Sequence, residues 1–177
     1  MINTNHIELD IKNVEKLVSD YIQQNFSPIS IGGGIPGLMA AVPVIIFNPY
    51  NVDTVNFRKH FKENKDESFS QKLLQLIEES GEKNSTIYNR ANIDRRHFSK
   101  IVNNEDYQPS KQTVLAFAIS LKLGFEKAKA LLASAGFTLS NANLSDVIVS
   151  AFIENKIFDV DVVNQILYKY NQPLLGG

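Results

Sequence analysis

The sequence predicts a mainly α-helical protein that carries a small N-terminal lobe of different character. After about residue 66, apolar side chains recur at three- and four-residue spacing in seven successive segments, which glycine, proline or capping residues separate. Before that point, residues 21–52 carry no charged side chain and are rich in glycine and proline. We therefore expect two domains, an N-terminal lobe of residues 1–65 and a helical module of residues 66–177.

The N-terminal lobe should contain one helix followed by an apolar turn-and-strand segment. Residues 8–26 place apolar side chains at helical spacing, and Pro28 ends that pattern. The next segment, "ISIGGGIPGLMAAVPVIIF", approaches the roughly 20 residues that a membrane-spanning helix needs. Three consecutive glycines, Pro36 and Pro43 would break such a helix, which favours a buried turn with "VIIF" as a short strand. We expect no membrane insertion.

Composition narrows the functional classes. The formal net charge is −1, so a nucleic-acid partner has to be argued from local charge and not from an overall basic excess. The chain has no cysteine, which excludes disulfides and thiolate metal sites. Its first residues mix charges and lack an uninterrupted apolar run, so they do not predict a signal peptide. These features favour a cytoplasmic protein.

The glycine-rich segment contains a literal match to the dinucleotide-binding pattern G-x-G-x-x-G at Gly32, Gly34 and Gly37. That chemistry requires a strand before the glycines and a full helix after them, whose N-terminus holds the pyrophosphate. Pro43 follows six residues after Gly37 and leaves no room for such a helix. Asp53, at the position of the acidic ribose ligand, follows a turn-like segment. We therefore expect tight turns here and no cofactor.

The helical module should begin near residue 68. Gly81, Gly124 and Gly136 are predicted helix stops, and Asp94 and Ser110 are predicted N-terminal caps. Asn84 or Ser85 is predicted to cap the second helix of the module. The seven predicted segments are residues 68–81, 84–92, 93–104, 110–124, 125–137, 145–155 and 160–170.

The middle of this module carries an ordered series of motifs. "LLQLIEESG", "STIYNRA" and "RRHFSKI" follow one another, with Asn92 and Ile93 between the last two and Pro109 ahead of the next helix. From about residue 69 to residue 137 this series resembles the five-helix Xre/Cro-type DNA-binding domain of the lambda and 434 repressor family. Asn92 stands where that family has its turn glycine, and asparagine tolerates the left-handed conformation. The resemblance implies a lambda-repressor-like helix-turn-helix core with two extra C-terminal helices.

The candidate recognition helix presents a basic outward face. If Phe98 and Ile101 turn inward, residues three and four positions apart share the opposite face. Arginine can grip guanine O6 and N7 with two hydrogen bonds, which suits such a helix to the major groove. The resemblance implies that the two arginines and the lysine read bases and that Asn84 contacts phosphate. The candidate DNA-binding residues are Asn84, Arg95, Arg96, His97, Ser99, Lys100 and Asn103.

The resemblance implies a transcriptional regulator that binds duplex DNA, and a homodimer is expected because family members often bind two half-sites. Two departures weaken the match. Tyr88 stands where the family usually has a small residue, and the loop after the helix is acidic at Glu105 and Asp106, where the family tends to be basic. Between residues 83 and 100, basic residues outnumber acidic ones by five to one. The alternative is a non-catalytic adaptor that uses the same fold, or the apolar N-terminal segment, to bind a protein partner.

A second set of motifs, including "ANIDRRHFSKI", "LLASAGFTLS" and "QPLLGG", extends to the last residue. It is similar to a helical module found at the C-terminus of some bacterial macro-domain proteins and in small standalone Xre-like proteins. This resemblance implies a bacterial regulatory or accessory role near stress or phage-defence genes. The first 65 residues are too few for a macro domain.

No pattern predicts catalysis or metal binding. His6, His60 and His97 are widely separated, and Ser99 lacks the flanking glycines of a nucleophile elbow. We therefore expect no enzyme activity and no metal. The last two predicted helices share an apolar stripe that suits either the core or a dimer seam, formed by Val147, Ile148, Phe152, Ile153, Val162, Val163, Ile166 and Leu167.

Overall fold

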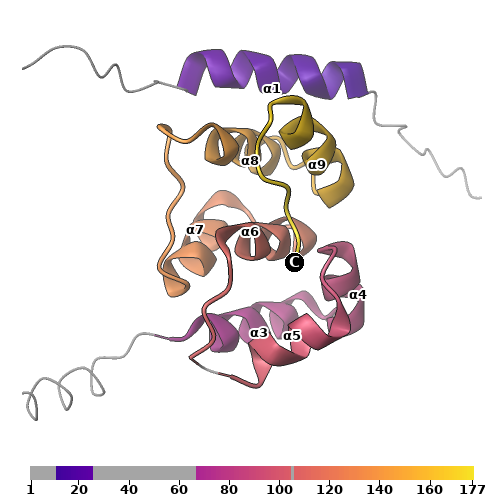
Figure 1. Ribbon diagram of the computed structural model, residues 1–177, viewed down its shortest axis with the longest axis vertical. Helices are drawn as coiled ribbons and strands as arrows, with labels where there is room; N and C mark the ends of the chain where they lie inside the picture. The colour runs from indigo at the N-terminus through magenta and orange to yellow at the C-terminus, as the bar shows by residue number, and fades with distance from the viewer. Residues whose placement is uncertain (1–10, 26–66, 105) are drawn as a thin grey trace, which may run out of the picture. The chain divides into compact units, whose positions relative to one another are not determined.

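The computed structural model describes residues 11–25, 67–104 and 106–177 (Figure 1). Across these residues the chain forms eight helices and no strand, which confirms the mainly α-helical prediction. The predicted glycine-rich turn and the short "VIIF" strand lie outside the described residues. The helices are α1 (Ile11–Asn25), α3 (Phe69–Ser80), α4 (Asn84–Arg90), α5 (Arg95–Val102), α6 (Lys111–Ser120), α7 (Phe125–Ser134), α8 (Leu144–Glu154) and α9 (Val160–Lys169).

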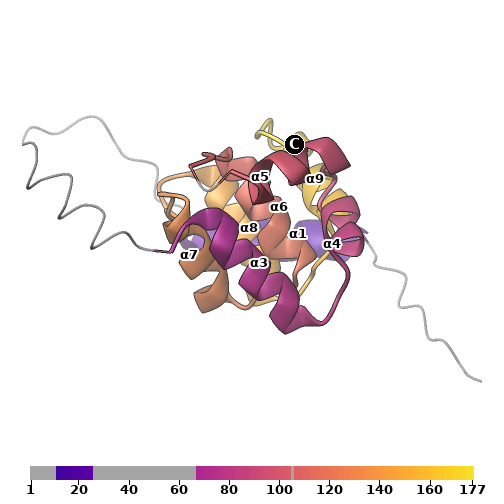
Figure 2. The same ribbon diagram turned by 90° about the horizontal axis from the view of Figure 1, so that it is seen from below.

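Helix α6 forms the centre of the core. Every residue from Thr113 to Ser120 is buried, and α6 contacts α4, α7 and α9 (Figure 1 and Figure 2). Helix α8 is buried almost as completely, because α7, α9 and α1 all pack against it. All eight residues of the apolar stripe predicted on the last two helices are buried within the chain. The core interpretation of that stripe is therefore confirmed.

Helix α1 joins the same compact unit as residues 67–177. Val14 and Val18 bury its apolar face, and α8 is the helix it packs against. Two polar side chains of α1 also contact the neighbouring helices. Tyr21 Oη donates to Glu154 Oε1 of α8 over 2.8 Å, and Glu15 forms an ion pair with Lys169 of α9. None of the described helices is both long and apolar enough to cross a membrane.

Side-chain caps start most of these helices. Ser68 and Gln71 form a reciprocal capping box at α3, and Gly81 ends that helix at φ 68°, as predicted. Asp94 and Ser110 cap α5 and α6, which confirms both predicted caps. The predicted cap of α4 is wrong: its N-cap is Lys83, whose side chain makes no capping bond, and Asn84 already belongs to the helix.

The predicted stop of α6 at Gly124 is also wrong. The helix ends at Ser120, and Lys122 reverses the chain in the left-handed conformation at φ 54°. The Leu123 N–H then donates to the Ala118 carbonyl over 3.0 Å, while Leu121 and Leu123 are both buried. Burial of these two leucines favours the early reversal, and Gly124 serves instead as the N-cap of α7.

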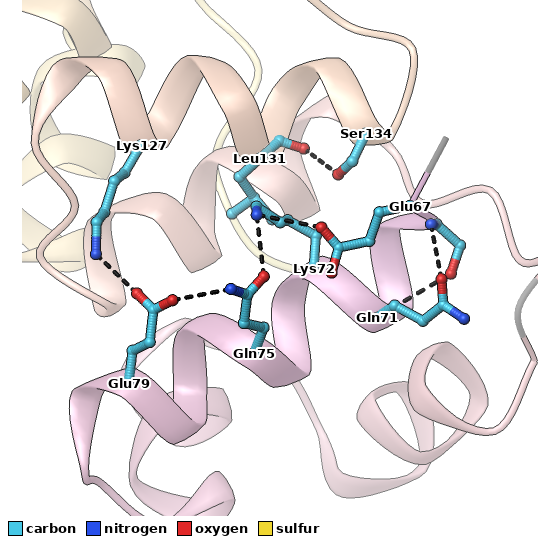
Figure 3. A network of polar contacts seen from close by, with 9 residues as sticks. Glu67, Gln71, Lys72, Gln75, Glu79, Lys127, Leu131 and Ser134 are labelled. Carbon is cyan, nitrogen blue, oxygen red and sulfur yellow. Dashed lines mark hydrogen bonds and ion pairs between the residues drawn. The ribbon is translucent and has the colours of Figure 1, made fainter. Parts of the chain in front are cut away.

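A polar network runs along the side of α3 that faces α7 (Figure 3). Lys72 pairs with Glu67 at 3.1 Å and donates to Gln75, which donates in turn to Glu79. Glu79 accepts from Lys127 of α7 over 2.8 Å, and this bond lowers the pKa of the Glu79 carboxyl. Because acids and bases alternate along the network, this surface contributes no excess positive charge.

Candidate nucleic-acid interface

Helices α4 and α5 are joined by a tight turn of residues 91–94. Asn92 adopts the left-handed conformation at φ 56°, as the sequence predicts for this position. The Ile93 N–H donates to the Tyr88 carbonyl over 2.9 Å, and the Ile93 side chain is only 2% exposed. The turn thus buries an apolar side chain between the two helices and sets the direction in which α5 leaves.

The burial pattern of α5 follows the predicted division into an inner and an outer face. Phe98 and Ile101 are buried, and Phe98 packs against the rings of Tyr88 and Phe117 at centroid distances of 5.1 and 6.2 Å. Tyr88 therefore forms an aromatic contact between α4 and α5. The exposed residues of α5 and its C-cap are Arg95, Arg96, Ser99, Lys100 and Asn103, and His97 is half-buried.

Asp94 places a carboxylate at the N-terminus of α5. Its Oδ1 accepts from the backbone N–H groups of Arg96 and His97 at 2.7 and 3.0 Å. The hydrogen bond from His97, followed by that from Arg96, lowers the pKa of the Asp94 carboxyl. Asp94 is therefore ionised at neutral pH, and its negative charge lies beside the two arginines.

Some basic side chains of α4 and α5 are bound to other residues of the protein, and others are not. Among the described residues, no hydrogen bond or ion pair engages the side chain of Arg95 or Arg96. Arg90, by contrast, donates two hydrogen bonds to the Glu82 carboxylate, at 2.6 and 3.1 Å, and a third to the Ser120 carbonyl. The bond from Arg90 lowers the pKa of the Glu82 carboxyl. Arg90 therefore links α4 to α6. Of the five basic residues in the predicted patch, the other four remain exposed.

Tyr107, in the loop after α5, contacts two of the candidate DNA-binding residues. Its hydroxyl lies 3.0 Å from His97 Nε2, and the two rings meet edge to face at 6.0 Å. Lys100 Nζ lies 5.1 Å from the centroid of the Tyr107 ring, within cation–π range. Sequence reasoning considered only the acidic residues of this loop and missed Tyr107, although an aromatic residue beside a basic helix is a detectable signal.

The remaining candidates are less closely associated with this cluster. Asn103 Nδ2 donates to Ser99 Oγ over 3.0 Å, so these two polar side chains pair along the outer face of α5. Asn84 is exposed in the first turn of α4. Asp106 is exposed in the loop, whereas Glu105 lies outside the described residues. Lys111, at the start of α6, is bound to the buried Asp146 of α8 at 2.6 Å and adds nothing to the basic surface.

In the described ranges, no group of three or more histidine, aspartate or glutamate side chains could hold a metal ion. Comparisons of the chain with protein-family models, with curated proteins and with solved structures return no match.

Proposed function

We propose that the protein is a transcriptional regulator of Xre/Cro type that binds duplex DNA through α5. The observation that carries this proposal is the pair of exposed arginines at the start of α5, which have no ion-pair partner among the described residues. The opposite face of α5 is anchored in the core by Phe98 and Ile101. A short helix so anchored can insert its N-terminal end into the major groove, where arginine recognises guanine.

In this proposal the side chains divide into base-reading and phosphate-binding groups. Arg95 and Arg96 read bases, with Ser99 and Asn103 beside them on the outer face of α5. Lys100, which the resemblance places among the base-reading residues, is assigned to phosphate here together with Lys83, because its ammonium lies over the Tyr107 ring. Asn84 adds a hydrogen bond to phosphate at the start of α4. The protein would act as a homodimer on two half-sites in a bacterial cytoplasm, in a stress or defence setting.

The charge distribution sets an upper limit on the salt dependence of binding. Between residues 83 and 100, four exposed basic residues remain available: Lys83, Arg95, Arg96 and Lys100. With a slope of about −0.9 per neutralised phosphate, one protomer should show a log–log slope against salt no steeper than about −3.6. Asp94 and Asp106 lie close by and should reduce this value. We therefore expect modest affinity for random DNA and a stronger requirement for a cognate site.

Fluorescence anisotropy with labelled duplexes tests the proposal. Arg96→Ala should weaken binding to a selected cognate site by about 1–3 kcal/mol, the value of one bidentate base contact. Lys127→Ala provides the matched control, because it also removes one exposed cation but lies on α7 and pairs with Glu79. Absence of binding to any duplex at low salt, or binding that salt does not weaken, would refute the proposal.

An adaptor function is the second candidate, and the acidic residues around α5 favour it. An ionised Asp94 caps the helix that would enter the groove, and Arg90 is neutralised by Glu82. As an adaptor, the protein should retain partner capture after substitution of Arg95 and Arg96. Polar substitutions at Leu38 or Ile45, in the apolar N-terminal segment, should abolish it. Affinity capture with these variants in parallel separates the two functions.

A further inference from the structure

After α9, which ends at Lys169, the chain turns back toward α5 and α6 (Figure 1 and Figure 2), and we call its residues 175–177 the strap. Leu175 anchors the strap: its side chain is 4% exposed, and the carboxamide of Asn164 binds both of its backbone polar groups. The Leu175 N–H donates to Asn164 Oδ1 over 2.7 Å, and the Leu175 carbonyl accepts from Asn164 Nδ2 over 3.1 Å. One side chain of α9 thus holds the strap in register.

The two glycines of the strap lie so close to the α4–α5 turn and α5 that a Cβ on either would be crowded. Gly176 has φ +124°, its carbonyl accepts from Thr113 Oγ1, and a Cβ there would lie 3.1 Å from the Asn92 carbonyl oxygen. The Gly177 N–H donates to the same carbonyl over 3.4 Å. A Cβ on Gly177 would overlap the His97 imidazole at Nδ1 and Cε1.

His97 lies between the strap and the Tyr107 side chain. One side of its ring faces Gly177, and its Nε2 lies 3.0 Å from the Tyr107 hydroxyl. The Tyr107 ring in turn supports the Lys100 ammonium at 5.1 Å. The strap, His97, Tyr107 and Lys100 therefore form a continuous series of contacts from the end of α9 to the exposed face of α5.

We propose that the strap is a positioning element of the DNA-binding surface, which holds Lys100 in place through His97 and Tyr107. Lysine loses much rotamer freedom when it binds a phosphate, and a side chain already resting on an aromatic ring loses less. This inference rests on the proposed function and deepens it. It assigns His97 and Tyr107 to positioning Lys100 and not to reading bases.

A double-mutant cycle between Gly177→Ala and Lys100→Ala tests the proposal by anisotropy on a random duplex. Gly177→Ala displaces either the His97 ring or the strap itself and should weaken binding about two- to tenfold, the range expected for residues of one contact network. In the Lys100→Ala background, Gly177→Ala should have no further effect. Additive effects of the two substitutions would show that the strap does not act through Lys100 and would overturn the proposal.

Two glycine substitutions elsewhere provide matched controls. Gly124→Ala adds a methyl group that meets no atom within 4 Å, at a position with ordinary φ, and should leave binding unchanged. Gly136→Ala adds strain at φ +74° but meets no atom within 4 Å, and it is the control for a Gly176→Ala variant, which should weaken binding because its Cβ would lie 3.1 Å from the Asn92 carbonyl oxygen. Thermal unfolding of all four variants shows which of them remain folded at the temperature of the binding assay.

Imidazole NMR signals separate failure of the strap from failure of the proposed function. The chain has only three histidines, so a His97→Gln variant assigns the His97 resonance. Gly177→Ala should shift that resonance and Gly124→Ala should not; an unshifted resonance would overturn the strap proposal even where DNA binding is intact. If the unaltered protein binds no duplex at low salt, the proposed function fails, and the role of the strap in DNA binding fails with it.

Discussion

Asp94 serves two purposes that conflict if α5 binds DNA. Its carboxylate satisfies two backbone N–H groups that α5 would otherwise leave without partners, which stabilises the start of the helix. The same carboxylate sets a negative charge next to Arg95 and Arg96, where a phosphate or a guanine edge would approach. Helix stability and DNA affinity should therefore respond differently to substitutions at this residue.

We predict that Asp94→Asn strengthens DNA binding with little loss of stability, whereas Asp94→Ala lowers the melting temperature. Asparagine also caps helices well, but it removes the charge; alanine removes both the cap and the charge. Because the folded state lowers the pKa of Asp94, its stabilising effect is present at neutral pH and disappears as the pH falls below the usual value of 3.8. The destabilisation by Asp94→Ala should therefore shrink in acid.

Circular dichroism melts at neutral and acid pH, paired with anisotropy titrations, check both parts of this prediction. A decrease in DNA affinity for Asp94→Asn would contradict the idea that this charge opposes DNA. An equal melting temperature for the asparagine and alanine variants would show that the cap is not important for α5.

At the scale of single residues, sequence patterns predicted several features of the candidate interface. The left-handed Asn92, the cap at Asp94 and the inward Phe98 and Ile101 all depend on neighbours within a few positions, and all were predicted correctly. The partners of Arg90 and Lys111 were not predicted. Glu82 and Ser120 reach Arg90 from different elements, and Asp146 is 35 residues from Lys111, so these contacts depend on the tertiary packing.

At the scale of helices, the ion pair between Lys111 and Asp146 joins the start of α6 to the start of α8. The Asp146 side chain is 2% exposed, and its Oδ2 accepts from Lys111 Nζ at 2.6 Å and from the Ser140 N–H at 2.9 Å. A carboxylate removed from water in this way depends on both donors. The Lys111 side chain is 22% exposed and lies at the edge of the same site.

Lys111→Met should therefore destabilise the fold by about 3 kcal/mol, the lower end of the range for breaking a buried pair, since the Ser140 N–H remains. The double variant Lys111→Met, Asp146→Asn should recover part of this loss because no uncompensated charge stays buried. Lys127→Met, which breaks a pair exposed to solvent, should change stability little. Urea denaturation midpoints measure all three. Equal midpoints for Lys111→Met and Lys127→Met would show that the buried pair has no special role.

The helix boundaries show where sequence patterns stop being informative. Sequence patterns located every described helix: apolar periodicity marks those that bury one face, whereas capping and stop signals bound a helix such as α6, which is buried on all sides. Glycine misled the prediction at Gly124, since the chain reverses two residues earlier at Lys122. A lysine does not by itself predict the left-handed conformation. The burial of Leu121 and Leu123 explains why the chain reverses at Lys122. The strap could not be predicted from the sequence either, because Gly176 and Gly177 contact residues more than 60 positions earlier in the chain.

At the scale of the molecule, α1 closes the core from a distant part of the sequence. It lies more than 100 residues before α8, yet it covers that helix and buries Val14 and Val18 there. The helix was predicted from its periodicity, whereas its docking site was not, since any apolar surface could have received it. The Tyr21 phenol is sensitive to this docking. Its pKa rises from 10.0 to about 12, mainly because of burial, and also because of the hydrogen bond to Glu154 and the charge of Glu154.

We predict that α1 releases from α8 in alkaline solution before the remaining helices unfold. Below pH 10 the Tyr21 phenol is protonated whether α1 is docked or released, so this group adds no pH dependence. Between pH 10 and about 12 the released phenol loses its proton while the docked one retains it, so docking weakens as the pH rises. The phenolate formed on release would also face the Glu154 carboxylate on any return, since the two groups lie 2.8 Å apart when docked.

Tyr21→Phe isolates this effect, because it keeps the ion pair between Glu15 and Lys169 and removes only the phenol hydroxyl. At neutral pH the variant should lose at most about 1 kcal/mol of docking energy, the net value of one solvent-exposed hydrogen bond. Above pH 10 its docking should fall less steeply than that of the unaltered protein. Tyrosinate absorbance should show a late-titrating phenol in the unaltered protein that the variant lacks. Trypsin cleavage at Lys12 and Lys16 follows the release of α1 in the same samples, and parallel pH profiles for both proteins would show that Tyr21 does not control docking.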